Sequence, residues 1–301
     1  MDETITGVPS GYSSLDNITH GWQNSNLIIL AARPSVGKTS FALNLARNAA
    51  LHPAKPIPVG FFSLEMSTGQ LVQRLLSAQS NIWLKSIKTG RLDDSQTENL
   101  YKKGVNPLSC SPIYIDDTPA LNIFELRAKA RRMKNKHKVG LIFIDYLQLM
   151  SGTGEHRNGN REQEISRISR DLKGLAKSLD IPIIALSQLS REVEKRGKGK
   201  MPVLSDLRES GAIEQDADMV MFLYRPGKEE VKEDAELANK GLLNIAKHRD
   251  GEADMDVIFE VNNSVQIWKE KADYTPLPSN WKPVAPVNNF YETDKEEENP
   301  F

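Results

Sequence analysis

The sequence predicts an α/β protein in which a mostly parallel, twisted sheet carries helices on both faces and an antiparallel hairpin at one edge. Short apolar runs alternate with longer stretches whose apolar residues recur at helical spacing, which is the pattern of parallel strands joined by crossover helices. The last two apolar runs are separated by Gly and Asn residues instead of a helix. That separation favours a hairpin.

The apolar runs that predict strands are residues 27–30, 59–64, 141–147, 183–187, 219–224, 242–247 and 257–261. Between Arg161 and Leu179, apolar side chains recur three and four residues apart. This spacing predicts an amphipathic helix that packs on the sheet.

Composition limits the classes of protein to consider. The 39 Lys and Arg residues against 40 Asp and Glu residues give a net charge of −1, so nucleic-acid binding would have to come from local loops. No apolar run approaches the roughly 20 residues that span a bilayer, and we expect no membrane association. A single cysteine, Cys110, excludes an intramolecular disulfide, and residues 1–11 show no signal pattern. A reducing, cytoplasmic location is expected.

The C-terminal region differs in composition from the rest of the chain. Residues 271–301 contain several prolines and an acidic cluster at residues 294–298, with few residues that could join a core. We predict a disordered tail there.

The strongest motif is the segment 32–39, Ala-Arg-Pro-Ser-Val-Gly-Lys-Thr, which follows the first apolar strand and begins a helical stretch. Such a loop turns its backbone N–H groups toward phosphates, Lys38 adds a point charge, and the Thr39 hydroxyl can ligate Mg²⁺. One departure is that Ala32 stands where the Walker A pattern has its first glycine. The residues expected to bind ATP here are Ser35, Val36, Gly37, Lys38, Thr39 and Ser40.

Two acids follow different apolar strands. Asp145 ends the run 141–145, which is the Walker B arrangement that holds Mg²⁺ and its water shell beside Thr39. Glu65 ends the run 61–64 and is placed to orient and deprotonate the attacking water. Because the two acids end separate strands, they favour a RecA-like P-loop arrangement over one in which both acids end the same strand.

Five blocks together resemble the bacterial replicative DNA helicase family, the DnaB family. They occur in the family's order at residues 31–39, 62–66, 144–148, 186–191 and 206–218, and the last is the most diagnostic. The family commonly has an alanine at the position of Ala32. The resemblance covers about residues 7–268 and implies a linker remnant at 1–10, a RecA-like motor domain at 11–270 and the tail at 271–301.

The resemblance assigns roles to four further side chains. Gln188 ends a strand and would sense the γ-phosphate, although a surface glutamine explains the sequence equally well. Arg74 would pack against the adenine, with a solvated helix arginine as the alternative. Arg249 would be an arginine finger for the neighbouring subunit's site, with Lys247 as its companion. Spacing alone favours an exposed basic turn whose one nearby acid is Asp250.

Two polar, glycine-containing segments, 151–160 and 191–211, could grip single-stranded DNA. Arg208 can bond a phosphate and Gly211 allows close approach of backbone N–H groups, while the resemblance carries over Glu209 as a loop residue. Because both segments lack aromatic residues for base stacking, we expect sequence-independent binding.

The resemblance implies a homohexameric ring that hydrolyses ATP with Mg²⁺ at subunit interfaces. It further implies 5′ to 3′ movement on single-stranded DNA, duplex unwinding during replication, and work with a primase and a helicase loader. Two alternatives stay open. A RecA or RadA-type recombination ATPase should lack the block 206–218, and an ATP-gated scaffold would assemble without unwinding or DNA-stimulated turnover.

Overall fold

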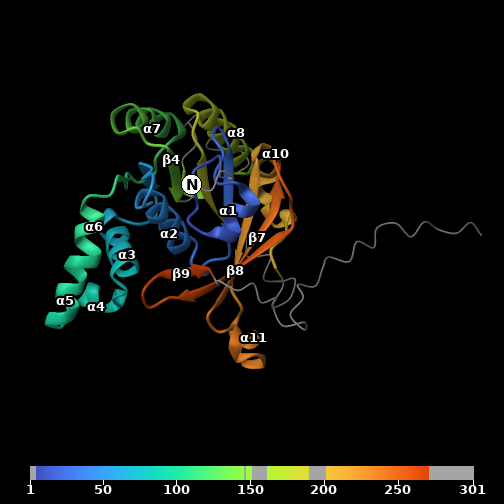
Figure 1. Ribbon diagram of the computed structural model, residues 1–301. Helices are drawn as coiled ribbons and strands as arrows, with labels where there is room; N and C mark the ends of the chain where they lie inside the picture. The colour runs from blue at the N-terminus through green and yellow to red at the C-terminus, as the bar shows by residue number, and fades with distance from the viewer. Residues whose placement is uncertain (1–4, 146, 151–160, 190–200, 271–301) are drawn as a thin grey trace, which may run out of the picture.

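The computed structural model describes residues 5–145, 147–150, 161–189 and 201–270, and these residues form one layered α/β unit (Figure 1). Its core is a nine-stranded sheet with the order β3-β2-β4-β5-β1-β6-β7-β8-β9. The strands from β3 to β6 in this order are parallel, and β7, β8 and β9 extend the sheet in antiparallel fashion. The predicted fold class is confirmed.

A strand is present at every run predicted from the sequence, and no strand end differs from the predicted end by more than two residues. Their bounds are β1 Leu27–Ala32, β2 Val59–Ser63, β3 Ile113–Asp116, β4 Leu141–Asp145, β5 Ile183–Gln188, β6 Met219–Tyr224, β7 Lys240–His248, β8 Met255–Asn262 and β9 Ile267–Glu270. Sequence analysis did not predict β3 and β9. Each has four residues, and neither is a fully buried apolar run. The predicted hairpin is therefore part of a three-stranded antiparallel extension, in which β7 is an interior strand.

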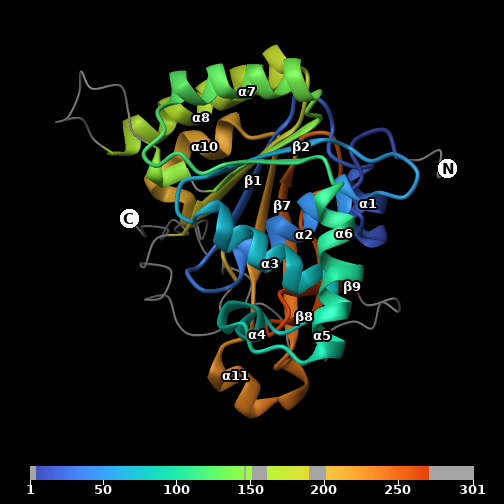
Figure 2. The ribbon, with the colours of Figure 1, turned by 90° about the vertical axis from the view of Figure 1, so that its left-hand side faces the viewer.

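The central strand β1 is buried along its whole length, and its side chains alternate between two hydrophobic clusters. Ile28 and Leu30 face the cluster beneath α2 Lys38–Ala50 and α3 Thr68–Ser80. Leu27 and Ile29 face the cluster beneath α7 Ile123–His137, α8 Arg161–Leu179 and α10 Gly211–Asp216. Figure 2 shows these two helical layers on opposite sides of the sheet. The helix predicted at 161–179 is confirmed.

Short helices fill the connections between strands. The chain between β2 and β3 forms α4 Leu84–Thr89, α5 Asp94–Asn99, the π-helical η1 Leu100–Val105 and α6 Asn106–Ser109, which extend away from the sheet with α3 (Figure 1). The remaining short helices are α1 Ser13–Thr19, η2 Leu147–Leu149, η4 Leu204–Ser210, α11 Lys228–Glu233 and η5 Ala235–Leu237. Among the described helices, none combines the length and apolar composition that a bilayer crossing requires.

The N-terminal segment is clamped to the last strand. The Tyr12 hydroxyl donates a hydrogen bond to the Trp268 carbonyl at 3.0 Å, and burial raises the pKa of that hydroxyl. The backbone N–H groups of Ser13 and Ser14 donate to the Glu270 carboxylate, where a negative charge at a helix N-terminus is favourable. Val8, which precedes α1, forms an antiparallel β-bridge with Trp22, which follows α1. The domain boundary proposed at residue 10 stays a prediction, and the predicted tail lies outside the described residues.

Two glycines provide a matched test of the packing. A Cβ atom at Gly241, in β7, would lie 2.3 Å from Trp268 Cζ3 and 2.9 Å from Val261 Cγ2. Gly174 is exposed on α8, with no atom within 4 Å of an added Cβ. We expect Gly241→Ala to lower the free energy of unfolding by about 1–3 kcal/mol through overpacking. Gly174→Ala should raise it by about 0.5–1 kcal/mol because alanine is the better helix former.

Urea denaturation followed by circular dichroism would measure both changes. A Gly241→Ala protein as stable as the unsubstituted chain would mean that Trp268 does not pack closely over β7.

Candidate nucleotide-binding site

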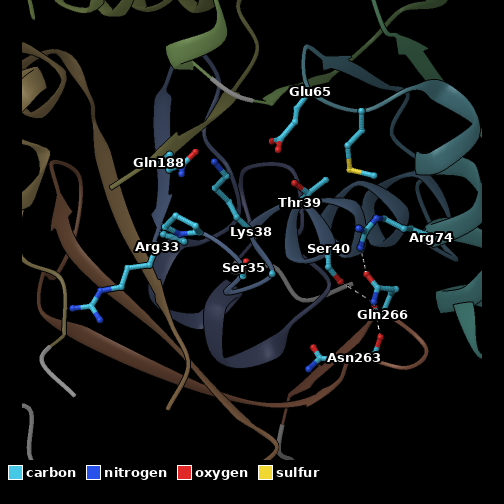
Figure 3. A pocket seen from close by; sticks show the side chains of 14 residues that line it. Arg33, Ser35, Lys38, Thr39, Ser40, Glu65, Arg74, Gln188, Asn263 and Gln266 are labelled. Atoms are coloured by element: carbon cyan, nitrogen blue, oxygen red, sulfur yellow. Dashed lines mark hydrogen bonds between the residues drawn. The ribbon is translucent and has the colours of Figure 1, made fainter. Parts of the chain in front are cut away.

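A cavity of about 430 Å³ opens where the carboxyl ends of parallel strands meet (Figure 3). Eight side chains or backbone segments predicted for nucleotide chemistry line it: Ser35, Gly37, Lys38, Thr39, Ser40, Glu65, Arg74 and Gln188. Ala32, Arg33, Pro34, Met66, Asn263 and Gln266 complete the lining. The structure thus brings together residues from β1, the loop after it, α2, the turn after β2, α3, β5 and the turn between β8 and β9.

The phosphate-binding loop, residues 32–39, turns sharply between β1 and α2. Ser35 and Gly37 have positive φ angles of 64° and 109°, and only glycine adopts the second of these without strain. A Cβ atom at Gly37 would also lie 3.1 Å from Trp268 Cζ2, so the indole supports the loop from beneath. Glycine is therefore required at position 37 for two reasons, the positive φ angle and the nearby indole.

Val36, which was predicted to contact ATP, is not part of the cavity lining and packs on the core.

A half-buried cation, Lys38, and a fully buried carboxylate, Asp145, lie beside the phosphate-binding loop, and of these two Lys38 lines the cavity. Burial lowers the pKa of the Lys38 ammonium, and the carboxylates of Asp145 and Glu65 oppose that shift. Asp145 is fully buried. Burial raises the pKa of Asp145, and Lys38 and the Thr39 hydroxyl act against the rise. Burial therefore disfavours both charges, and a phosphate oxygen beside Lys38 or a cation beside Asp145 would favour them.

Thr39 and Asp145 form the pair of oxygen ligands expected for Mg²⁺. The Thr39 hydroxyl donates to Asp145 Oδ2 at 2.6 Å, and Asp145 Oδ1 is buried without a hydrogen-bond partner. Mg²⁺ prefers hard oxygen ligands and usually keeps several waters. Hydroxyl and carboxylate oxygens therefore fit this ion at the end of β4, beside the first turn of α2.

Glu65 lies across the cavity from Lys38 and Thr39, with its carboxylate turned toward them (Figure 3). Two local contacts set its place. The backbone N–H of Leu64 donates to the Asp145 carbonyl at 2.7 Å, which fastens the end of β2 to the end of β4. The Ser63 hydroxyl donates to the Met66 carbonyl at 2.7 Å and closes the turn that carries Glu65. An exposed carboxylate held at this point can accept a proton from a water molecule.

Gln188 ends β5, and its side chain points toward Lys38 (Figure 3). Its backbone is held from both sides by Gln148, whose amide accepts from the Gln188 N–H at 3.2 Å and donates to the Gln188 carbonyl at 3.0 Å. Gln148 also donates to the Ser187 hydroxyl at 2.9 Å. Gln148 belongs to the block 144–148 but was assigned no role from the sequence, although a glutamine three residues after the Walker B acid was a visible signal.

Lys247 and Arg249 do not line the cavity of their own chain. The Lys247 ammonium donates to the carbonyls of Glu214 and Ala217 at 2.5 and 2.8 Å, at the C-terminal end of α10. Arg249 pairs with the buried carboxylate of Asp218 at 3.1 Å. The expectation that Asp250 is the one nearby acid is wrong, because β6 lies beside β7 and brings Asp218 under Arg249.

The residues predicted to contact DNA belong to η4 and α10. The side chains of Arg208 and Glu209, the surroundings of Gly211 and the segments 151–160 and 190–200 lie outside the described residues. Their roles stay predictions.

Comparison with known proteins gives a consistent result. Residues 7–266 match the family model of the DnaB-like helicase C-terminal domain. The chain is 50% identical over 250 residues to the replicative DNA helicase DnaB of Geobacillus stearothermophilus, covering 83% of this chain and 54% of that protein. It is also 50% identical over 249 residues to the replicative DNA helicase DnaC of Bacillus subtilis, covering 82% and 53%. The chain thus spans about half the length of these curated relatives.

Solved structures agree with the sequence matches. The ATPase domain of another protein superposes with a TM-score of 0.81 at 38% identity, covering 90% of this chain and 93% of that chain. The structure of a DnaB-like replicative helicase, described with its interactions with primase, superposes with a TM-score of 0.80 at 38% identity, covering 89% and 62%. The RecA-like architecture predicted from the separated acids is confirmed.

Buried Asp145 leads to a prediction about stability. Because burial raises the pKa of Asp145 above its usual range, the native state favours the protonated form, and stability is lost as pH rises through the unfolded and then the folded pKa. Asp145→Asn should therefore raise the Tm of the nucleotide-free protein at pH 7, by roughly 2–4 °C for about 1 kcal/mol. The gain should vanish near pH 4, and Mg²⁺-dependent ATP binding should be lost.

A contrasting variant is Asp117→Asn, because the Thr68 N–H holds the pKa of this exposed carboxyl below its usual range. It should lower Tm at pH 7, and the loss should vanish at low pH. Thermal melts across pH 4–8 would compare the two, and a destabilised Asp145→Asn protein would contradict the prediction.

Proposed function

This chain belongs to the DnaB-like helicase C-terminal domain family, and from that membership and the cavity we propose that it is the ATP-hydrolysing motor domain of a replicative DNA helicase. The observation that supports this proposal best is that the phosphate-binding loop and Glu65 line one cavity, while Asp145, at the end of a different strand, bonds Thr39 of that loop. The strand-separated acids belong with the RecA-like fold, and the relatives named above are replicative helicases.

The proposed roles in hydrolysis follow from position. Backbone N–H groups from residues 35–40 and the Lys38 ammonium bind the phosphates of ATP. Thr39 and Asp145, partly through water, would hold Mg²⁺, which when bound neutralises charge on the β- and γ-phosphates. Glu65 orients the attacking water and accepts its proton. Gln188, whose side chain points toward Lys38, is proposed to bond the γ-phosphate through its amide and to respond to its loss.

A complete site is proposed to need a neighbouring subunit. Because Lys247 and Arg249 do not line the cavity of their own chain, we infer that Arg249 is an arginine finger for the cavity of the next subunit, with Lys247 beside it. A closed ring of identical subunits supplies such a contact to every site. The family membership supports six subunits.

The work done by this ring is proposed to be 5′ to 3′ movement on single-stranded DNA and separation of the duplex. Arg208, Glu209 and Gly211 would contact the DNA backbone without reading its sequence. A solved relative is described with its interactions with primase. We propose a primase and a helicase loader as partners of this chain as well. A cytoplasmic location follows from this role. The RecA or RadA alternative is disfavoured by the family match over residues 7–266.

Glu65→Gln tests the hydrolytic step. The amide cannot accept a proton, so the rate of ATP hydrolysis should fall about 10²- to 10⁴-fold while ATP binding is retained. Phosphate release and equilibrium binding of a fluorescent ATP analogue would separate these properties. Glu98→Gln, an exposed glutamate on α5, is the matched control. Hydrolysis at the unsubstituted rate would assign the water to another group.

Mixing two inactive variants tests the shared site. Lys38→Ala disables phosphate binding, and Arg249→Ala removes the finger. Each variant alone should hydrolyse ATP at about one thousandth of the unsubstituted rate, or more slowly still. A mixture should regain part of the rate, because some interfaces combine an intact cavity with an intact finger. Arg131→Ala, an exposed arginine on α7, should behave like the unsubstituted chain.

The same assay should show a steep rise of rate with protein concentration and stimulation by single-stranded DNA, with a six-subunit species by mass. Absence of rescue in the mixture would remove the shared-site proposal. Nucleotide-driven assembly without DNA-stimulated turnover would favour the scaffold alternative.

A further inference from the structure

The turn between β8 and β9 forms one wall of the nucleotide cavity, although no motif assigns it a role. Asn263 and Gln266 from this turn line the cavity beside Ser40 and Arg74. Figure 3 shows the arrangement: Lys38, Thr39 and Glu65 lie on one side, and Arg74, Gln266 and Asn263 lie beyond Ser40. The cavity therefore has a phosphate end and a second end built from polar side chains of α3 and this turn.

The backbone of Gln266 is fixed to the helix that follows the phosphate-binding loop. Its carbonyl accepts hydrogen bonds from the Ser40 hydroxyl at 3.2 Å and from the buried Asn44 amide at 2.8 Å. The residue has a φ angle of 59°, a conformation that costs free energy for a residue with a side chain and persists where the surroundings hold it. Gln266 is therefore held in a constant position relative to the first turn of α2.

The side chain of Gln266 holds Arg74. Arg74 donates from Nη1 to Gln266 Oε1, and the Gln266 amide nitrogen donates to the Asn263 carbonyl at 2.5 Å. Burial lowers the pKa of the Arg74 guanidinium, and its Nε atom is buried without a partner. A flexible, partly buried arginine would adopt several rotamers without an anchor. The hydrogen bond to Gln266 selects one of them.

The planar guanidinium of Arg74 is suited to stack on an aromatic ring. With the phosphates of the proposed ATP ligand at the loop end, its nucleoside would extend past Ser40 to the Arg74 and Gln266 end of the cavity. Resting on the proposed ATP-binding function of this cavity, we propose that Gln266 is a positioning residue that fixes Arg74 against the face of the nucleotide base. Stacking on the face of the base is stronger for a larger ring system, so purine nucleotides should bind more tightly than pyrimidine nucleotides.

Binding measurements on the full chain test this role with two probes, ATP and inorganic tripolyphosphate. Gln266→Ala should weaken ATP binding about tenfold, since hydrogen bonds to charged groups are the stronger class. It should leave tripolyphosphate binding within about twofold, because that probe has no base. The ratio of ATP to CTP affinity should fall in the same variant. Gln73→Ala, on the same helix as Arg74 but not part of the cavity lining, should change none of these values.

A double-mutant cycle then asks whether Gln266 acts through Arg74. Arg74→Ala should weaken ATP binding at least as much as Gln266→Ala, and the double variant should be no weaker than Arg74→Ala alone. Additive losses would overturn the positioning role. Equal weakening of ATP and tripolyphosphate would also overturn it, by showing general damage to the loop.

Binding of the two probes by the unsubstituted chain shows whether a failed test concerns the role of Gln266 or the proposed nucleotide site as a whole. If the unsubstituted protein binds neither probe, the nucleotide-site proposal fails. If it binds both probes and Gln266→Ala binds ATP equally well, only the role of Gln266 is wrong.

Discussion

The removal of the Lys38 ammonium and the Asp145 carboxylate from water is the constraint on which this site depends. Burial pushes the pKa of Lys38 down and that of Asp145 up, so each charge is held at a cost to the empty protein. Phosphate oxygens are the natural partners of Lys38, and a divalent cation is the natural partner of Asp145. The fold therefore keeps a free-energy cost that ligand binding relieves, which is a common relation between active sites and stability.

The sheet order makes this arrangement possible. With β1 between β5 and β6, and β4 and β2 beyond β5, the ends of four strands deliver the loop, Gln188, Asp145 and Glu65 to one rim. Side chains alternating along β1 enter two separate hydrophobic clusters, so helices cover both faces and the nucleotide cavity opens at the rim. Cross-strand contacts such as Leu64 N–H to the Asp145 carbonyl set the positions of the acids.

The parts predictable from sequence are those whose cause is local. Buried parallel strands are continuous apolar runs, and the loop at 32–39 is defined by residue types that its backbone geometry needs. What sequence analysis missed depends on distant partners. The partly buried strands β3 and β9 have no long apolar run, and Gln266 sits in an ordinary polar turn, 192 residues from Arg74. Asp218 lies beside Arg249 because β6 pairs with β7, and residue spacing in the sequence does not reveal that pairing.

The support of the phosphate-binding loop by Trp268 also has a consequence for how the protein is made. The loop is synthesised early, but the indole beneath Gly37 and the Gln266 carbonyl that bonds Ser40, 226 residues from it, are synthesised near the end of the domain. Contacts between residues so far apart in sequence form late in folding, because forming them costs the entropy of closing a large loop. A nascent chain on the ribosome, which folds from its N-terminus, thus carries the motif long before it has a nucleotide pocket. The proposed nucleotide pocket is therefore complete only after the last strand of the sheet has been synthesised.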